Sequence, residues 1–208
     1  MLSKLAAQVD VVELSVEDSI SKMADTAIKK LSSLDGVAVI GFSMGGMVAL
    51  EIARRAPELI RKLALLNTNS HADLPERQAA RMQHLKEASS TGMATVIGQY
   101  YLDRYLHKAN PHTRKLIVRM ATELGTECFA AQIRALATRQ DSNAILANIK
   151  CPTLILGSLQ DQLCHPDEQI QMQQKIEGGK LVMLDQCGHF STLEKPLAVN
   201  KALRDWYL

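Results

Sequence analysis

Ser43 stands in a sequence context that indicates nucleophilic chemistry, within residues 41–46, GFSMGG. A serine hydroxyl is a poor nucleophile unless a base removes its proton and the backbone holds it clear of the sheet. Gly-x-Ser-x-Gly between an apolar strand and a helix is typical of a tight turn that does this. Gly41 and Gly45 fit such a turn, because crowding disfavours a Cβ two residues before and after the serine. At the start of the following helix, the free N–H of Met44 would bind a developing oxyanion.

A serine nucleophile needs a base, and His189 is the histidine best placed to supply one. It follows the last predicted strand directly, in the sequence QCGHF. Loops at the carboxyl ends of parallel strands are where α/β sheets build their sites. The other histidines lie in or beside a predicted helical stretch, or several residues beyond a strand: His71, His84, His107, His112 and His165.

The base in turn needs an acid to orient it, and three aspartates follow predicted strands. Asp161 comes four residues after Gly157, and its carboxylate could accept a hydrogen bond from one ring nitrogen of His189. Asp167 is explained by capping of the helix that begins there, and Asp185 lies on the same short loop as His189. We therefore prefer Asp161, which gives the chain order nucleophile, acid, base.

These residues are positioned by a chain that alternates strands and helices on both sides of a long helical stretch. Short apolar or β-branched runs predict strands at residues 9–14, 37–40, 62–67, 152–157 and 180–184. Helical spacing predicts helices from Ser15, as N-cap, to about Leu34, from Met44 to about Ala56, at 168–176 and at 196–206. This alternation implies a parallel sheet with right-handed crossovers.

The stretch from 71 to 149 follows a different pattern, because it contains no convincing strand. Helices are predicted there at 74–89, 93–106, 111–124, 127–139 and near 145. We interpret residues 71–149 as an all-helical cap, or lid, inserted into an α/β core formed by residues 1–70 and 150–208. The predicted fold class is therefore α/β, a mostly parallel sheet flanked by helices, with a helical cap insertion.

The bulk composition argues against several other classes of protein. A chain of 208 residues with 47% hydrophobic and 22% charged residues can bury the core of one globular domain. Its formal net charge is +2 and its basic residues are scattered, which argues against a nucleic-acid partner. The first residues lack the apolar stretch of a signal peptide, and no apolar run is long enough for a membrane.

The four cysteines form no CxxC pair and match no zinc pattern. We therefore expect reduced thiols in a cytoplasmic protein. The serine chemistry expected at Ser43 implies no metal and no cofactor. The expected partner is a small-molecule acyl substrate, with a homodimer as one possible assembly.

Three segments together resemble the α/β-hydrolase superfamily, in particular small bacterial esterase-like members with a helical cap. Residues 41–68 look like the nucleophile elbow, its helix and the next strand. Residues 151–161 look like the acid-bearing strand, and residues 187–196 like the histidine loop, with Pro196 opening the final helix. The resemblance covers nearly the whole chain and implies that the cap covers the pocket and shapes specificity.

The chain departs from the family's pattern ahead of the serine. Family members place several strands and an oxyanion loop of His-Gly or Pro-Gly type there, whereas only 42 residues precede Ser43 and none of them matches that loop. Our preferred interpretation is an N-terminally shortened form. The other is a reduced hydrolase, in which strand 9–14 lies beside 37–40 or a partner chain fills the gap. Either would leave Met44 as the one evident oxyanion donor, and losing one donor typically costs about 3–4 kcal/mol.

The predicted function is a serine hydrolase that cleaves a small ester or other acyl substrate through Ser43, His189 and Asp161, with an acyl-enzyme intermediate. The alternative is a catalytically impaired protein of the same fold, which binds a small ligand or a partner because the oxyanion loop is missing. A third hypothesis keeps the scaffold and changes the reaction to lyase, acyltransferase or cofactor-free peroxidase chemistry, since fold does not fix function.

Overall fold

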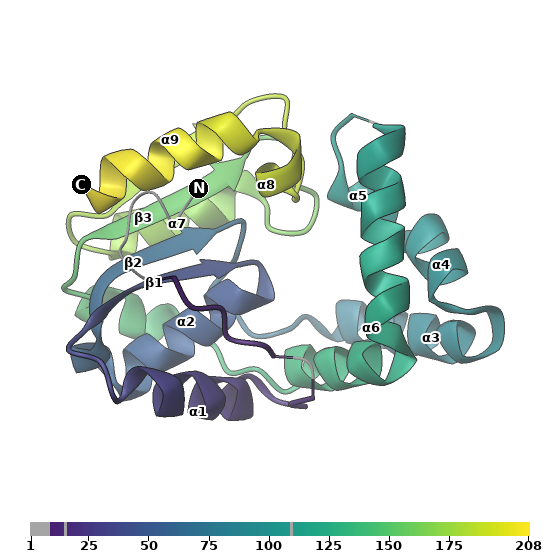
Figure 1. The fold of residues 1–208 in the computed structure, drawn as a ribbon, viewed down its shortest axis with the longest axis horizontal. Coiled ribbons are helices and arrows are strands. Elements are labelled where there is room, and N and C mark those ends of the chain that lie inside the picture. The colour runs from purple at the N-terminus through teal and green to yellow at the C-terminus, as the bar shows by residue number, and fades with distance from the viewer. Residues whose placement is uncertain (1–8, 15, 109) are drawn as a thin grey trace.

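A four-stranded parallel sheet forms the centre of the computed structural model, which describes residues 9–14, 16–108 and 110–208 (Figure 1). The strands are β1 (Val37–Phe42), β2 (Ile60–Leu66), β3 (Thr153–Ser158) and β4 (Lys180–Leu184), in the spatial order β1-β2-β3-β4. All three pairings are parallel, as the alternation of strands and helices predicted. All four carboxyl ends therefore meet at one edge of the sheet.

Helices cover both faces of this sheet, so its strands are apolar on both sides. The flanking helices are α1 (Ile20–Leu31), α2 (Met44–Arg55), α7 (Pro166–Lys175), α8 (Ser191–Glu194) and α9 (Pro196–Tyr207). Leu63, Leu65 and Ile155 pack in the core shared with α1, α2 and α7. Their strand neighbours Ala64 and Leu154 pack in the core shared with α9. The two cores alternate along each strand because successive side chains point to opposite faces.

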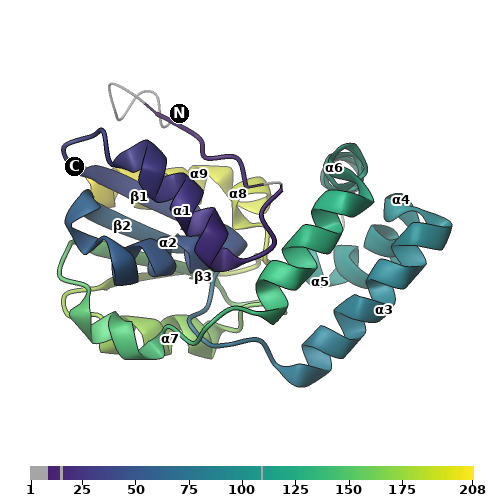
Figure 2. The ribbon, with the colours of Figure 1, turned by 90° about the horizontal axis from the view of Figure 1, so that it is seen from below.

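A helical segment connects β2 to β3 and lies to one side of the sheet (Figures 1 and 2). It comprises α3 (Pro75–Thr91), α4 (Met93–Val96), a π-helical turn (Ile97–Tyr101), α5 (Leu102–Tyr105) and α6 (Pro111–Ala137), before a 3-10 helix at Asn143–Asn148. The segment has an apolar cluster of its own, which includes Val96, Leu102 and Ile117. Gly125, with a φ of 79°, breaks the helical geometry inside α6. This is the boundary expected between helices 111–124 and 127–139.

The strand predicted at residues 9–14 is wrong. These residues form no ladder, and among the described residues β1 pairs only with β2. Val12 and Leu14 pack against the core while Val11 is 76% exposed, and Lys30 Nζ donates to Val11 O at 2.9 Å. The β-branched composition predicts a strand only where a neighbouring backbone is available, and here a helix side chain contacts the segment instead.

The first helix begins later than predicted. Ser15, the expected N-cap, lies outside the described residues. Ser19 caps α1, and its Oγ accepts a hydrogen bond from Lys22 N–H at 3.2 Å. This satisfies one of the backbone donors that a helix leaves free at its N-terminus.

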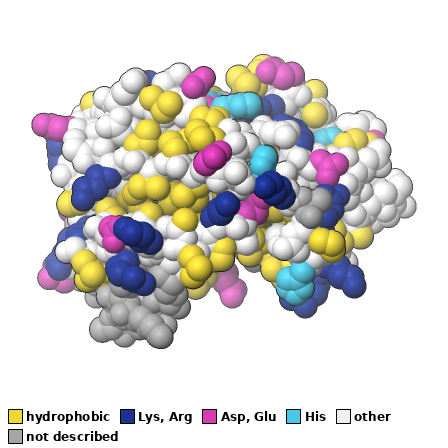
Figure 3. Space-filling view, turned by 90° about the horizontal axis from the view of Figure 1, so that it is seen from above, with side chains coloured by type: hydrophobic (Ala, Val, Ile, Leu, Met, Phe, Trp, Pro, Cys, Tyr) yellow, Lys and Arg dark blue, Asp and Glu magenta, His cyan; other side chains and the backbone are white. Residues whose placement is uncertain are grey.

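One face of the molecule mixes charged and apolar side chains. Figure 3 shows Lys and Arg side chains interspersed with Asp and Glu on the face seen from above, with hydrophobic side chains gathered between them. Within the described part of the chain, no helix combines the length and apolar character needed to cross a membrane. The four cysteines, all of which the structure describes, are unpaired.

Candidate active site

Ser43 lies in the turn between β1 and α2, and its backbone is strained. Its φ of 51° and ψ of −117° place a residue with a side chain in a region that few residues other than glycine adopt. Ser43 N–H donates to Leu66 O at 2.9 Å, and Thr68 Oγ1 donates to Ser43 O at 2.7 Å. The end of β2 therefore holds the turn in this conformation.

Gly41 and Gly46, rather than Gly45, supply the space that this turn needs. A Cβ at Gly41 would lie 2.4 Å from Gly45 O, and a Cβ at Gly46 would lie 2.5 Å from the Thr68 side chain. A Cβ at Gly45 would meet no described atom within 4 Å outside its own helix. The crowding predicted at Gly45 is therefore wrong, because the backbone of this residue, and not its Cβ position, faces Gly41.

The three side chains predicted for catalysis lie along one line of hydrogen bonds. His189 Nε2 is 2.8 Å from Ser43 Oγ, and His189 Nδ1 is 2.9 Å from Asp161 Oδ2. His189 and Asp161 are each 2% exposed. Because an ionised carboxylate only accepts hydrogen bonds, Asp161 selects the tautomer with the proton on Nδ1. His189 Nε2 is then free to accept from the Ser43 hydroxyl.

Asp161 sits in the loop after β3 among donors that keep it ionised. Its Oδ1 accepts from the N–H groups of Leu163 at 2.8 Å and Cys164 at 3.0 Å, and its Oδ2 accepts from Asn67 Nδ2 at 3.0 Å. Burial raises the pKa of Asp161. The hydrogen bond and charge of His189, the Cys164 N–H and the Asn67 amide outweigh burial, so the pKa is lowered.

Asn67 is a residue of the site that sequence reasoning missed. It follows β2 directly, with a φ of 44° that asparagine tolerates better than most residues. Its buried amide also donates to Ser158 Oγ at 3.0 Å, and its Oδ1 accepts from Ser191 Oγ at 2.5 Å. Its position at the carboxyl end of a parallel strand was the signal that could have found it.

The two competing aspartates lie away from the imidazole. Asp167 is exposed in the first turn of α7, which confirms its predicted place at a helix N-terminus, but the N-cap residue is His165 and not Asp167. Pro166 starts this helix two residues before the predicted start at 168, as proline does at a first helical position. Asp185 is exposed and accepts from Gln160 Nε2 at 3.1 Å. Within the described residues, neither carboxylate is hydrogen-bonded to the imidazole.

Aromatic rings surround the imidazole of His189. Phe42 lies with its ring centroid 5.3 Å from that of His189, and Phe190 at 5.9 Å. Tyr105, at the end of α5 in the helical segment, stacks on His189 at 6.0 Å with 22° between the planes. These apolar walls exclude water and strengthen the hydrogen bonds of the imidazole.

Met44 begins α2, where backbone N–H groups lack intrahelical acceptors and carry partial positive charge. Gly46 N–H already donates to Ser43 O at 2.9 Å. The Met44 N–H is one of the groups without an intrahelical acceptor, and Met44 directly follows Ser43 in the sequence. Its role toward an oxyanion stays a prediction.

Among the described residues, one group of three could approach a metal ion. Ligand atoms of Asp161, Cys164 and His189 lie within 4.8 Å of one another. His189 Nδ1 and the Asp161 carboxylate are already bonded to each other. Burial raises the pKa of the Cys164 thiol well above its ordinary value, and the charge of Asp161 raises it further. The thiolate that a metal needs is therefore disfavoured, and the group fits a hydrogen-bonded pair better.

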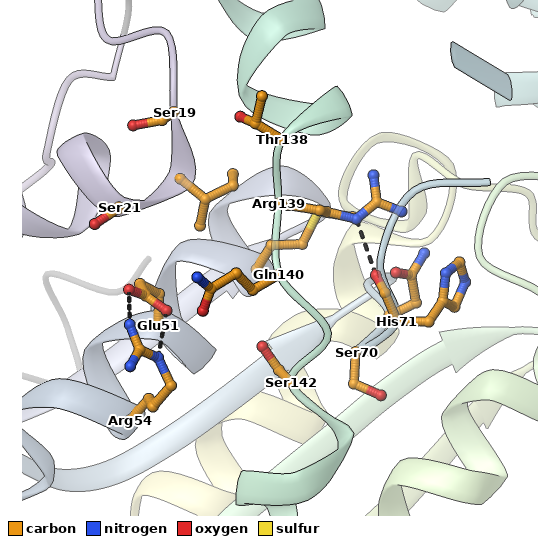
Figure 4. A pocket seen from close by; sticks show the side chains of 13 residues that line it. Ser19, Ser21, Glu51, Arg54, Ser70, His71, Thr138, Arg139, Gln140 and Ser142 are labelled. Atoms are coloured by element: carbon orange, nitrogen blue, oxygen red, sulfur yellow. Dashed lines mark hydrogen bonds and ion pairs between the residues drawn. The ribbon is translucent and has the colours of Figure 1, made fainter. Parts of the chain in front are cut away.

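A separate cavity of about 90 Å³ lies among α1, α2 and the loops that lead into and out of the helical segment (Figure 4). Ser70 and His71 line it from the loop after β2, and Arg139 and Gln140 from the loop after α6. None of the three residues in the line of hydrogen bonds borders this cavity. It is therefore distinct from the site around Ser43.

Comparison with known proteins connects this geometry to a family. A family model described as alpha/beta hydrolase fold matches residues 15–196. A pimeloyl-(acyl-carrier protein) methyl ester esterase from Neisseria meningitidis is 27% identical over 176 residues, which cover 81% of this chain and 56% of that protein. The matched region thus spans little more than half the length of this relative.

A second relative and a solved structure extend the comparison. A proline iminopeptidase from Lactobacillus helveticus is 29% identical over 202 residues, which cover 86% of this chain and 68% of that protein. The structure of a thermophilic esterase from Thermogutta terrifontis superposes with a TM-score of 0.83 at 26% identity, over 93% of this chain and 73% of that one. Two of these three proteins are named as esterases and the third as a peptidase.

Proposed function

The chain belongs to the α/β-hydrolase fold family, and on this premise we propose that it is a serine hydrolase acting on a small ester or other acyl compound. Ser43 is the nucleophile, His189 the general base and Asp161 the group that orients His189. The unbroken line of hydrogen bonds, 2.8 Å from Ser43 Oγ to His189 Nε2 and 2.9 Å from His189 Nδ1 to Asp161 Oδ2, is the observation that supports this proposal most directly.

The first half of the reaction forms an acyl-enzyme. Ser43 Oγ attacks the acyl carbon while His189 Nε2 takes the hydroxyl proton, and Asp161 stabilises the resulting imidazolium. The tetrahedral intermediate then collapses: the bond from the acyl carbon to the leaving group breaks, and His189 returns the proton to the leaving group. In the second half, water attacks the acyl carbon with His189 again as base, which releases the acid and restores Ser43.

The oxyanion of the intermediate needs donors that are already in place. Met44 N–H, at the positive end of α2, is the donor that the sequence predicted and the one we assign to this role. The strained φ of 51° at Ser43 supports the assignment, because such strain is typical of a nucleophile turn that leads directly into a helix.

The rings around His189 support a proposal for the substrate class. The rings of Phe42, Tyr105 and Phe190 around His189 favour an apolar acyl or alcohol group. We propose that residues 71–149 act as the cap, since Tyr105 at the end of α5 contributes one of these walls. The Neisseria and Thermogutta proteins are named as esterases and the Lactobacillus protein as a peptidase, so we place esters first and amides second.

Hydrolysis of p-nitrophenyl esters with short and longer acyl chains tests the proposal. We expect turnover that falls by about 10⁴-fold or more in Ser43→Ala, as removal of the nucleophile does in other serine triads. Ser90→Ala is the matched control, because Ser90 is exposed on α3 and its hydroxyl bonds only its own helix at Glu87 O among the described residues.

Two results would contradict the proposal. Hydrolysis that persists in Ser43→Ala would assign the activity to another group. A folded wild type with no activity toward any ester or amide, but with saturable binding of the same compounds, would favour the catalytically impaired binder instead.

A further inference from the structure

The Glu194 carboxylate joins two segments that are far apart in the chain. Its Oε1 accepts from Gly188 N–H at 2.8 Å, in the loop that carries His189. Its Oε2 accepts from His107 N–H at 2.9 Å and from Lys108 N–H at 3.4 Å, in the turn after α5. Three backbone donors therefore converge on one carboxylate, and an ionised acceptor makes such bonds about twice as strong as neutral ones.

Gly188 shows how closely the two segments approach. A Cβ at this position would lie 2.7 Å from His107 N, 2.8 Å from Tyr105 O and 2.9 Å from Glu194 Oε1. Two of these three atoms are backbone atoms of the helical segment, which cannot move aside as a flexible side chain can. The contact between Glu194 and the two segments therefore requires glycine at position 188.

Further contacts join the same two segments, residues 105–108 and residues 186–190. Phe190 N–H donates to Tyr105 O at 3.2 Å, and Lys108 Nζ donates to Gln186 Oε1 at 2.9 Å. Tyr105 also stacks its ring on the imidazole of His189 and meets Phe190 edge-on at 5.0 Å. The position of Tyr105 and the position of the imidazole are thus set by one group of contacts.

We propose that Glu194 is a positioning residue. Its three hydrogen bonds, which we call the clasp, join the α5–α6 turn of the helical segment to the histidine loop and thereby fix both Tyr105 and His189 beside Ser43. This inference rests on the proposed function, since its kinetic consequence requires Ser43 to be the nucleophile. Glu194 lies outside the line of proton transfer and touches none of the reacting atoms. It acts through the two backbones that it joins.

Glu194→Gln removes the clasp with the smallest change of shape. All three partners are N–H donors, so the amide NH₂ of glutamine must face at least one donor. Glu194→Asp keeps the charge but is one methylene shorter, so its oxygens can reach Gly188 or His107 but not both. Glu177→Gln is the matched control, because Glu177 is an exposed acid that pairs with Lys150, and both residues lie outside segments 105–108 and 186–190.

Amide hydrogen exchange tests the clasp without requiring any activity. We expect Glu194→Gln to speed exchange at residues 105–108 and 187–190 while the core strands stay protected, and Glu194→Asp to speed exchange on one side only. Exchange in both variants equal to wild type would overturn the proposal. This readout remains decisive even if wild type proves to have no hydrolase activity, so failure of the proposed function and failure of the clasp are separable.

Reaction of Ser43 with a fluorophosphonate tests the effect on His189. We expect the rate constant per folded molecule to fall about tenfold in Glu194→Gln, by less in Glu194→Asp, and to stay unchanged in Glu177→Gln, because small misplacements of a catalytic group are costly. A merely structural role would lower Tm and leave this rate constant unchanged. That result, with accelerated exchange, would overturn the positioning role.

Discussion

Asn67 Nδ2 lies 3.0 Å from Asp161 Oδ2, so the residue after β2 donates directly to the carboxylate after β3. Asn67 is fully buried, and Ser191 Oγ bonds its carbonyl oxygen, which fixes the orientation of the amide. Asn67 Nδ2 and His189 Nδ1 therefore bond the same carboxylate oxygen, Asp161 Oδ2. Asn67 thus supports the geometry that the proposed mechanism requires.

Replacing Asn67 by aspartate should move the pH dependence of the site. Asn67→Asp removes a donor and places a second carboxylate against Asp161, and both changes raise the pKa of Asp161 from its lowered value. The added negative charge also lies near the imidazole, whose protonation ends labelling, so the acid limb of the pH–rate profile for Ser43 labelling should move to higher pH. Asn67→Gly, which keeps the positive φ and adds no charge, should move it less. Superimposable profiles for all three proteins would show that Asn67 does not act on Asp161.

Asp161→Asn should reduce turnover by about 10⁴-fold with little change in fold, because an amide can hold His189 in the wrong tautomer. Asp185→Asn is the matched control, since Asp185 is exposed and bonds Gln160 instead of the imidazole. Steady-state kinetics of ester hydrolysis measures both. If Asp161→Asn stayed within tenfold of wild type, another residue would have to orient His189.

The two glycines of the turn should respond differently to alanine. Gly41→Ala forces a Cβ against the backbone of Gly45 and should destabilise the protein by about 3 kcal/mol, the upper end for overpacking. Gly45→Ala meets no described atom outside its helix and should cost nothing, because alanine favours a helix by up to about 1 kcal/mol. Urea unfolding gives both free energies. Equal losses in the two variants would mean that the turn is not packed as described.

His71 should make stability depend on pH. Its Nε2 is 2.7 Å from Glu168 Oε1 and its Nδ1 is 2.6 Å from Ala72 O, so both bonds need the protonated ring. The bond to Glu168 is the main cause that raises the pKa of His71 above 6.5; Ala72 O and the Glu168 charge add to it, while burial and Arg139 oppose it. The charge of His71 in turn helps to lower the pKa of nearby Asp141.

A group whose pKa is raised by folding stabilises the folded protein when it is protonated. This stabilisation is fully present below the unfolded-state pKa of 6.5, and it is lost as the pH rises through the folded-state pKa of His71. The free energy of unfolding should therefore fall by on the order of 1 kcal/mol across this window, the usual net value of a hydrogen bond. Glu168→Gln should flatten the dependence. An equally steep fall in Glu168→Gln would assign it to another group.

The sequence allowed the sheet and the meeting of Ser43, Asp161 and His189 to be predicted for one shared reason. Each residue follows a parallel strand, and the carboxyl ends of such strands converge whatever the detailed packing. The helical segment was also predictable, because its helices follow a periodic pattern. The roles of the three side chains remain predictions that the experiments above test.

The remaining features depend on contacts between segments that no local pattern reports. Residues 9–14 have the composition of a strand but form no ladder. Gly46 is needed because of Thr68, and Gly188 because of the turn after α5, both of which are distant in sequence. Glu194 lies within the motif that resembles the histidine loop, yet two of its three partners are backbone N–H groups of the helical segment.

Covalent labelling of the folded protein by a fluorophosphonate, followed by intact mass and peptide mapping, tests directly whether Ser43 is the nucleophile. We expect one adduct per chain, located on Ser43, absent in Ser43→Ala and formed at least about 100-fold more slowly in His189→Ala, since a general base contributes about that much or more. A folded protein that takes no label, or that takes the same label in Ser43→Ala, would contradict it.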